Sequence, residues 1–134
     1  MVKEIIQAIR KAEEQTSGEI RVHLKHFCRG DVLTEAKKTF HKLRMHRTKH
    51  RNGVLILVAL KSKRFAVYGD EAVHQKVGDS FWNETRDKIL AYFTKGRIKE
   101  GIVAGVESVG EKLRIHFPHE KGGKNELSNK VVED

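Results

Sequence analysis

Hydrophobic residues near the start of the chain recur at the spacing of an α-helix and then switch to the spacing of a β-strand. The first stripe predicts an amphipathic helix over residues 2–15, and it consists of Val2, Ile5, Ile6, Ile9 and Ala12. After a break at Thr16-Ser17-Gly18, apolar and polar residues alternate, which predicts a strand with one face in solvent, where Arg21, His23 and Lys25 lie. A second helix is predicted to begin after Asp31, a good N-cap residue, with an apolar stripe of Leu33, Ala36, Phe40 and Leu43.

The middle of the chain carries a run that is apolar at every position. This run, VLILVAL at residues 54–60, is rich in branched side chains and predicts a central strand that is covered on both faces. After a short turn, RFAVYG predicts a returning strand, so the two strands form a hairpin. Asp70 is predicted to cap a short helix. Two longer helices follow, one up to Gly96 and a last one that Pro118 ends.

The order of these elements predicts the fold class. Because a helix joins the first two strands, they should be parallel, whereas the next pair is an antiparallel hairpin. The sequence therefore indicates an α/β fold, a three-layer α/β/α sandwich on a small mixed sheet made of a parallel pair plus a hairpin. Gly101 and Gly105 are predicted to let the last helix pack closely on that sheet. The length of 134 residues fits one domain, predicted over residues 1–118, and residues 119–134 are predicted to form a mobile tail.

Three polar corners of the predicted strands should meet at one edge of the sheet. Parallel strands start at the same edge and a hairpin returns to it, so the corners are Thr16-Ser17-Gly18-Glu19, Arg51-Asn52-Gly53 and Gly69-Asp70-Glu71. We call these three corners the polar rim. Residues of these types also build ordinary turns and helix caps, so a purely structural role is the alternative to a binding site.

Composition and charge narrow the class of protein. Hydrophobic residues make up 38% and charged residues 34%, which is typical of a soluble globular chain, and no apolar run is long enough to span a bilayer. A single cysteine, Cys28, and an N-terminus without the features of a signal peptide indicate the cytoplasm. The net charge of +9 favours anionic partners. The basic segment at residues 44–51 lacks the aromatic residues that stack on bases, which disfavours nucleic acid as a partner.

Several stretches of the chain together resemble the TPM domain family, long described as a domain of unknown function. They are AEEQTSGEIRVHL, RNGVLILVAL, RFAVYGDEAVHQKVGDSFW and GIVAGVESVGEKLRIHFP, and the resemblance covers roughly residues 2–118. The chain is most similar to the short, stand-alone cytosolic branch of the family. The resemblance implies a small sheet between layers of helices. It also implies properties credited to different members: acid phosphatase activity in plant thylakoids, divalent-cation binding at the polar rim, and association with membrane complexes or receptors.

The divalent-cation site that the resemblance implies falls on the polar rim. Its expected ligands are Asp70, Glu71, Asn52 and Glu19, and the rest of the rim is Thr16, Ser17 and Arg51. Many members carry Asp-Asn-Gly where this chain has Arg51-Asn52-Gly53. Because the positive charge of Arg51 would repel a metal ion that an aspartate would attract, we expect calcium or another divalent cation to be held weakly. An anion site is the alternative, with donors from Arg51 and from the helix that follows Asp70.

Two functions of different classes follow from these patterns. The first is a binding module that uses the polar rim to recognise a protein or a membrane-associated partner. The alternative is a metal-dependent phosphatase acting on phosphate esters, which needs carboxylates that clamp ions or a nucleophile with its base. The rim offers three acids beside an arginine, and the patterns identify no catalytic residue. We therefore favour the binding module.

Overall fold

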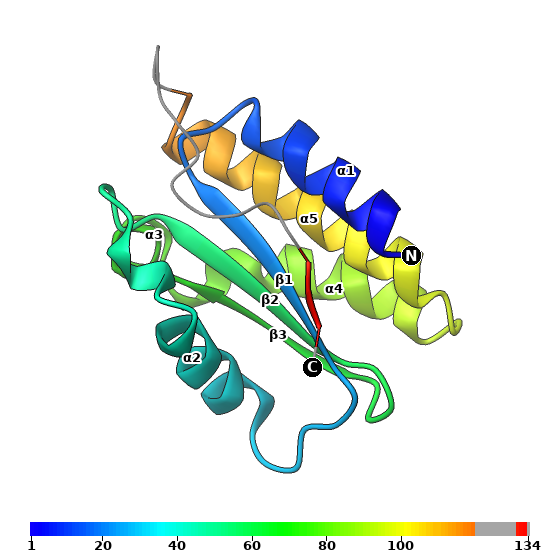
Figure 1. Ribbon diagram of the computed structural model, residues 1–134. Coiled ribbons are helices and arrows are strands. Elements are labelled where there is room, and N and C mark those ends of the chain that lie inside the picture. Colours follow the sequence, from blue (N-terminus) through cyan, green and yellow to red (C-terminus); the bar gives the residue numbers. More distant parts are fainter. Residues whose placement is uncertain (120–130, 134) are drawn as a thin grey trace.

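The computed structural model describes residues 1–119 and 131–133 and contains the helices and strands in the predicted order (Figure 1). The elements are α1 (Val2–Glu13), β1 (Glu19–Lys25), α2 (Val32–Lys42), the 3₁₀ turn η1 (Met45–Arg47), β2 (Gly53–Ala59), β3 (Arg64–Gly69), α3 (Glu71–Val77), the 3₁₀ turn η2 (Asp79–Trp82), α4 (Asn83–Phe93), α5 (Ile98–His116) and β4 (Val132–Glu133). In the part of the chain that the structure describes, no helix is long and apolar enough to cross a membrane.

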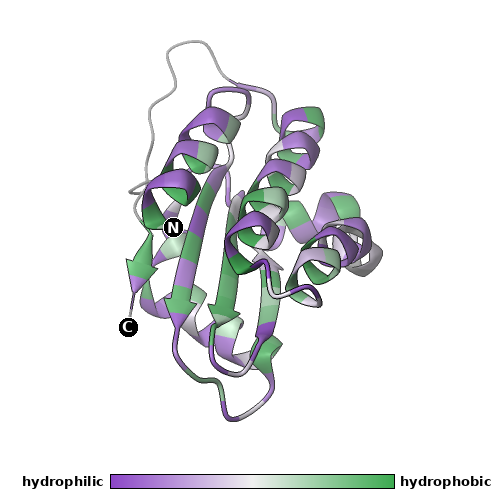
Figure 2. Cartoon of the chain, turned by 90° about the vertical axis from the view of Figure 1, so that its right-hand side faces the viewer, coloured by the Kyte–Doolittle hydropathy of each residue, from purple (hydrophilic) through white to green (hydrophobic). Residues whose placement is uncertain are grey.

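The sheet has the strand order β3-β2-β1-β4, so β2 lies in its interior. β1 and β2 are parallel, with Glu19 opposite Gly53, and β2 and β3 are antiparallel, with Val54 opposite Gly69. Every residue of β2 is buried, because helices cover both of its faces. Figure 2 shows a strand in the middle of the sheet that is hydrophobic along nearly its whole length. The predicted central strand and the predicted parallel pair plus hairpin are thus confirmed.

The helices form the two outer layers of the predicted sandwich (Figure 1). α1, α4 and α5 cover one face and pack on the strands in the main hydrophobic core, to which they contribute Ile9, Ile89 and Val106 among others. α2 covers the other face, where Ala36 packs with Leu57 and Ala66. The α/β fold class is therefore confirmed.

The glycines of α5 allow close packing, but mainly against a helix. A Cβ atom at Gly101 would lie 2.6 Å from the Phe93 ring, and one at Gly105 would lie 2.6 Å from Ile89, so both glycines face α4. Ile56 of β2 is the next neighbour of Gly105, at 3.6 Å. The prediction of close packing was right. Its stated partner, the sheet, was wrong for Gly101, because α4 lies directly beside α5.

The edge of the sheet at β1 differs from the sequence prediction in two ways. The predicted wet face is not fully wet, since the side chains of Glu19 and His23 are buried and Lys25 binds Glu35 of α2 at 2.8 Å. β4, which the sequence did not predict, pairs in parallel with β1 at His23 and Leu24. The mobility predicted for residues 119–134 concerns mostly 120–130 and 134, which lie outside the described residues.

Candidate functional site

The polar rim forms where the topology places it, at the edge where β1 and β2 begin and β3 ends. Arg51 takes the left-handed backbone conformation, with φ of 50°, and its carbonyl accepts a hydrogen bond from the Ala72 amide at 3.1 Å. The Asp70 amide donates to the Gly53 carbonyl at 2.9 Å. Gly69 is needed between them because a Cβ atom there would lie 3.0 Å from the Val73 side chain. These contacts bring the second and third corners of the rim into direct contact.

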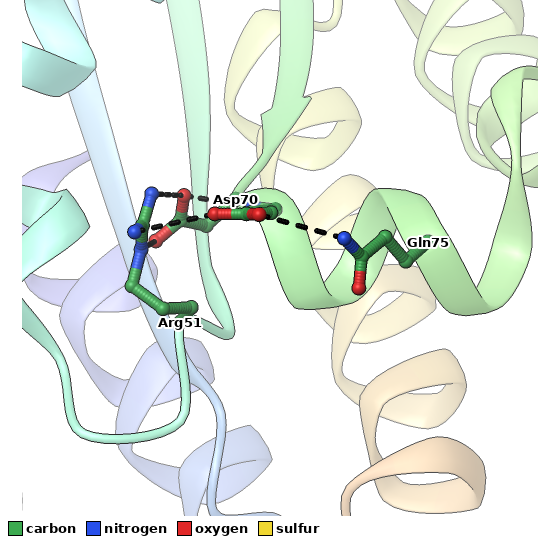
Figure 3. Close-up of polar contacts among 4 residues, drawn as sticks. Arg51, Asp70 and Gln75 are labelled. Atoms are coloured by element: carbon green, nitrogen blue, oxygen red, sulfur yellow. Dashed lines mark hydrogen bonds and ion pairs between the residues drawn. The ribbon is translucent and has the colours of Figure 1, made fainter.

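An arginine–carboxylate pair links those two corners (Figure 3). Nε of Arg51 donates to Oδ2 of Asp70 at 2.8 Å, and a terminal nitrogen donates to Oδ1 at 2.9 Å, which is the two-pronged geometry that favours such pairs. Arg51 also lies 3.3 Å from a carboxylate oxygen of Glu71. The side chain of Asp70 is only 3% exposed, against 42% for Arg51 and 59% for Glu71. The hydrogen bond to Asp70 is the main cause that raises the pKa of Arg51.

The Asp70 carboxylate also caps α3. Its Oδ1 accepts a hydrogen bond from the Glu71 amide at 2.7 Å, which confirms the predicted N-cap. Figure 3 shows Gln75, one turn along α3, and its amide nitrogen donates to Glu71 at 3.4 Å. Both oxygens of Asp70 are therefore engaged by donors of the chain itself, and Arg51 supplies two of the three bonds.

The first corner of the rim ties β1 to the end of α5. The hydroxyl of Thr16 donates to the Phe117 carbonyl and accepts from the Gly18 amide at 3.0 Å, and the Ser17 amide donates to the same carbonyl at 3.0 Å. Asn52, which is buried, connects this corner to the second one through its side-chain amide, 3.2 Å from the Ser17 hydroxyl. The first corner of the rim is thus a hydrogen-bonded turn at Thr16 and Ser17, and Asn52 links it to the second corner.

Glu19 lies in a different charge cluster. It is buried at the start of β1, and together with Glu13 it favours the charged form of Arg21, whose pKa is lowered mainly by burial. Glu13 in turn accepts a hydrogen bond from the Ile20 amide at 2.7 Å. The expected ligands of the rim are therefore distributed over separate local networks.

The arrangement does not fit a divalent cation while Arg51 holds Asp70. Among residues 1–119 and 131–133, no three His, Cys, Asp or Glu side chains form a group that could hold a metal ion. A hard cation such as calcium needs several oxygen ligands at once. It would have to displace the guanidinium from the buried carboxylate. A weak divalent-cation site at the rim thus stays a prediction.

A groove that the sequence did not predict opens beside the Arg51–Asp70 pair. Its volume is about 720 Å³, and it is bounded by α2, the edge of β3, α3 and the start of α4. Leu33, predicted as part of the core stripe of α2, is instead 50% exposed and lines this groove, as do Lys37 and His41 one and two turns further along. The available signal was the spacing of Lys37 and His41, which lie four and eight residues after Leu33 and therefore on the same helix face.

The lining of the groove carries more positive than negative charge. Three lining residues are cations and two are carboxylates, which gives a net charge of +1 when the two histidines are neutral. The cations are Lys37, Arg51 and Arg86, the carboxylates are Asp70 and Glu71, and the histidines are His41 and His74. Both carboxylates bind Arg51. Tyr68 also lines the groove, and burial, followed by the Asp70 charge, raises its pKa. The groove therefore suits an anionic ligand better than a cationic one.

Comparison with known proteins places the chain in a family. The model of the TPM domain matches residues 2–112. The chain is similar to the BA42 protein of the psychrophilic bacterium Bizionia argentinensis, whose NMR structure has a TM-score of 0.92, 44% identity, and coverage of 99% of this chain and 92% of that one. Among proteins with curated descriptions, none is similar enough to count as a match.

Two more distant structures share the fold alone. The N-terminal domain of a protein from P. gingivalis has a TM-score of 0.63 and 19% identity, and the match covers 87% of this chain and 75% of that one. The N-terminal domain of the cg2496 protein from Corynebacterium glutamicum has a TM-score of 0.59 and 14% identity, over 84% and 68% of the two chains. The family model covers most of the sequence, and the predicted resemblance is confirmed: the chain belongs to the TPM domain family.

Proposed function

We propose that this TPM domain is a binding module, and that its ligand surface is the groove beside the polar rim. The observation that carries the proposal is the Arg51–Asp70 pair, which neutralises the buried rim acid from within the chain. With that acid occupied, Lys37 and Arg86 give the groove its excess of positive charge. Such a surface attracts an anionic partner over a distance of about one Debye length, roughly 8 Å at physiological salt. The partner is an anionic segment of a protein or of a membrane-associated complex.

The phosphatase alternative finds less support in the same contacts. Phosphoryl transfer relies on metal ions clamped by carboxylates, or on a nucleophile with a base positioned beside it. The carboxylate best placed for such a task, Asp70, is bound by an arginine and a backbone amide. A shared fold does not carry an activity from one member of a family to another. We therefore expect no turnover of phosphate esters.

A divalent cation enters this proposal only as a competitor of Arg51. Calcium at the rim would take the Asp70 carboxylate from the guanidinium, so its binding free energy is reduced by the ion pair that it breaks. Binding of calcium is then weak. The cation regulates access to the rim instead of forming a permanent part of it.

Affinity capture with charge-reversed variants tests the binding function. The immobilised protein is exposed to an extract of its native cells, with and without calcium, beside the double variant Lys37→Glu/Arg86→Glu. Lys38→Glu is the matched control, because Lys38 is an exposed neighbour on α2 that does not line the groove. We expect the wild type and the control to retain the same partner and the double variant to lose it. Equal retention by all three proteins, or retention by none, would refute a partner in the groove.

A further inference from the structure

We infer that the groove accepts an extended acidic peptide segment, which pairs as an additional strand with the outer edge of β3. The inference rests on the proposed binding function and specifies the partner and its mode of recognition. β3 lies at the end of the strand order, with β2 as its one neighbour in the described sheet (Figure 1). Strand addition to such an edge is an established mode of peptide recognition, because the backbone supplies affinity and the side chains supply specificity.

The register of the hairpin shows which backbone groups face the groove. The hydrogen bond from the Asp70 amide to the Gly53 carbonyl, 2.9 Å long, marks these two residues as a hydrogen-bonded pair. Such pairs alternate with non-bonded ones in an antiparallel ladder, and Val54 lies opposite Gly69. The amide and carbonyl groups of Gly69 and Val67 therefore point away from β2. Both residues line the groove; Gly69 is partly exposed, whereas Val67 is only 3% exposed, so a paired segment has to enter the recess to reach it.

The walls of the groove permit one strand and disfavour open-ended assembly. α2 stands on one side of the β3 edge, and α3 with the start of α4 stands on the other, so the edge is recessed. A long, exposed edge strand is an aggregation risk, and covering its sides is one way in which proteins reduce that risk. The volume of about 720 Å³ lies within the range of ligand sites, about 300–1,000 Å³. The recess thus suits a single short segment better than an unlimited stack of strands.

Charge on the two walls selects an acidic segment. Lys37 and His41 belong to the α2 wall, and the α3–α4 wall holds His74, Arg86 and Glu71, whose carboxylate binds Arg51. Successive side chains of a strand point to opposite faces. In the neighbouring β3, Tyr68 packs toward α2 and Val67 toward the core on the α4 side. The cation available to an acidic residue of an added strand is therefore Lys37 on the α2 side and Arg86 on the α4 side.

Amide hydrogen exchange on the wild-type protein gives the direct test. The probe is a short peptide of alternating valine and glutamate with blocked ends, and the control peptide has the same sequence and charge with every backbone amide N-methylated. The methyl groups remove the donors and stand between the two strands, so the control cannot pair with β3 in either register. With saturating probe we expect exchange at Val67 and Gly69 to slow by about tenfold, while Ala66 and Tyr68, whose amides already face β2, change little. The N-methylated peptide should bind more weakly and protect neither amide, because its methyl groups keep its carbonyls away from the β3 edge.

Variants separate charge from strand pairing. Lys37→Glu/Arg86→Glu should weaken probe binding by at least about tenfold, whereas Lys38→Glu should bind as the wild type does. Val67→Pro removes an outward-facing amide and keeps the ladder to β2, because proline is tolerated at such edge positions. This variant should weaken binding of the probe and leave binding of the N-methylated peptide unchanged. The exchange pattern of the wild type remains decisive if this variant does not fold.

Each outcome bears on the inference in a different way. Equal binding of both peptides without protection of Val67 and Gly69 refutes strand pairing and leaves an anion-binding groove. Binding of neither peptide refutes the strand and the anionic ligand together. Protection that rises with protein concentration in the absence of peptide identifies a second copy of the chain as the occupant, and it refutes the acidic segment. The alternating protection pattern with the probe alone supports the inference.

Discussion

The exchange of Asp70 for asparagine tests whether the buried carboxylate at the rim serves as a helix cap only or also as the partner of Arg51. Asparagine is itself a good N-cap, so the bond to the Glu71 amide, 2.7 Å long, can be kept. The two bonds from Arg51 cannot both be kept, because the side-chain amide nitrogen of asparagine would face the guanidinium donors. The variant therefore separates the two roles of one side chain.

The expected loss follows from the geometry of the pair. Hydrogen bonds to charged groups contribute about 1.5–3 kcal/mol, and we take the lower end because the Arg51 side chain is 42% exposed to screening solvent. Asp70→Asn should thus reduce the free energy of unfolding by about 1.5 kcal/mol. An unfolding entropy of about 2.1 cal/mol/K per residue over 134 residues converts this loss to a fall in Tm of about 5 °C.

Asp31→Asn is the matched control for thermal unfolding followed by circular dichroism. Asp31 caps α2 through the Thr34 amide at 3.0 Å, but its remaining bond goes to the Thr34 hydroxyl at 2.7 Å and the residue is exposed. Asparagine keeps this cap, so Tm should change by no more than about 1 °C. If Asp70→Asn and Asp31→Asn melt alike, the arginine pair contributes nothing measurable. Asp70 would then be a cap, and the explanation of the groove charge would fail.

Three further predictions concern the rim and the core. In calcium titrations followed by Tm, Arg51→Asp should bind calcium at least about tenfold more tightly than the wild type, because a carboxylate replaces the cation that holds Asp70. The left-handed backbone at this position tolerates aspartate, and no response in either protein would exclude the rim as a metal site. Turnover of a generic phosphate ester, with or without magnesium or calcium, should stay below about 1 s⁻¹, and a faster rate that Asp70→Asn abolishes would favour the phosphatase. Gly101→Ala should lower the free energy of unfolding by about 1–2 kcal/mol, because its Cβ would lie 2.6 Å from Phe93. Gly30→Ala is the control and should leave the free energy of unfolding unchanged, because a Cβ atom there has no neighbour within 4 Å. Equal Tm values for the two variants would contradict the packing at α4.

The elements and their order could be predicted because local periodicity determined them. The fully apolar run of β2 indicated an interior strand, and the helix between β1 and β2 indicated a parallel pair. The convergence of Arg51 and Asp70 then followed from topology alone, since strands that share a direction share an edge. The cap at Asp70 followed from residue type. Each of these predictions depends on neighbours in sequence or on a single rule of chain connection.

The features that were missed depend on contacts between distant segments. Leu33 was predicted as part of the apolar stripe of α2. It lies instead at the side of the helix where the groove opens, because the sheet of the described residues ends at β3. β4 pairs through only two residues, too few to produce a periodic pattern. The wet face predicted for β1 assumed that nothing would cover His23, and a strand pattern contains no information about that.

Arg51 connects the rim to the groove, and its effect could be predicted only in part. The family resemblance implied that Arg51 stands where many members carry an acid, and hence that a metal ion would be disfavoured. It did not indicate that the guanidinium would close on Asp70 in two-pronged geometry and leave that carboxylate 3% exposed. With the acid neutralised, an approaching anion meets Lys37 and Arg86 without opposition from a buried negative charge. Arg51 alone would thereby convert an edge suited to cations into an edge suited to anions. The acidic-peptide experiment measures the affinity of that edge for an anion, and the calcium titration measures its affinity for a cation.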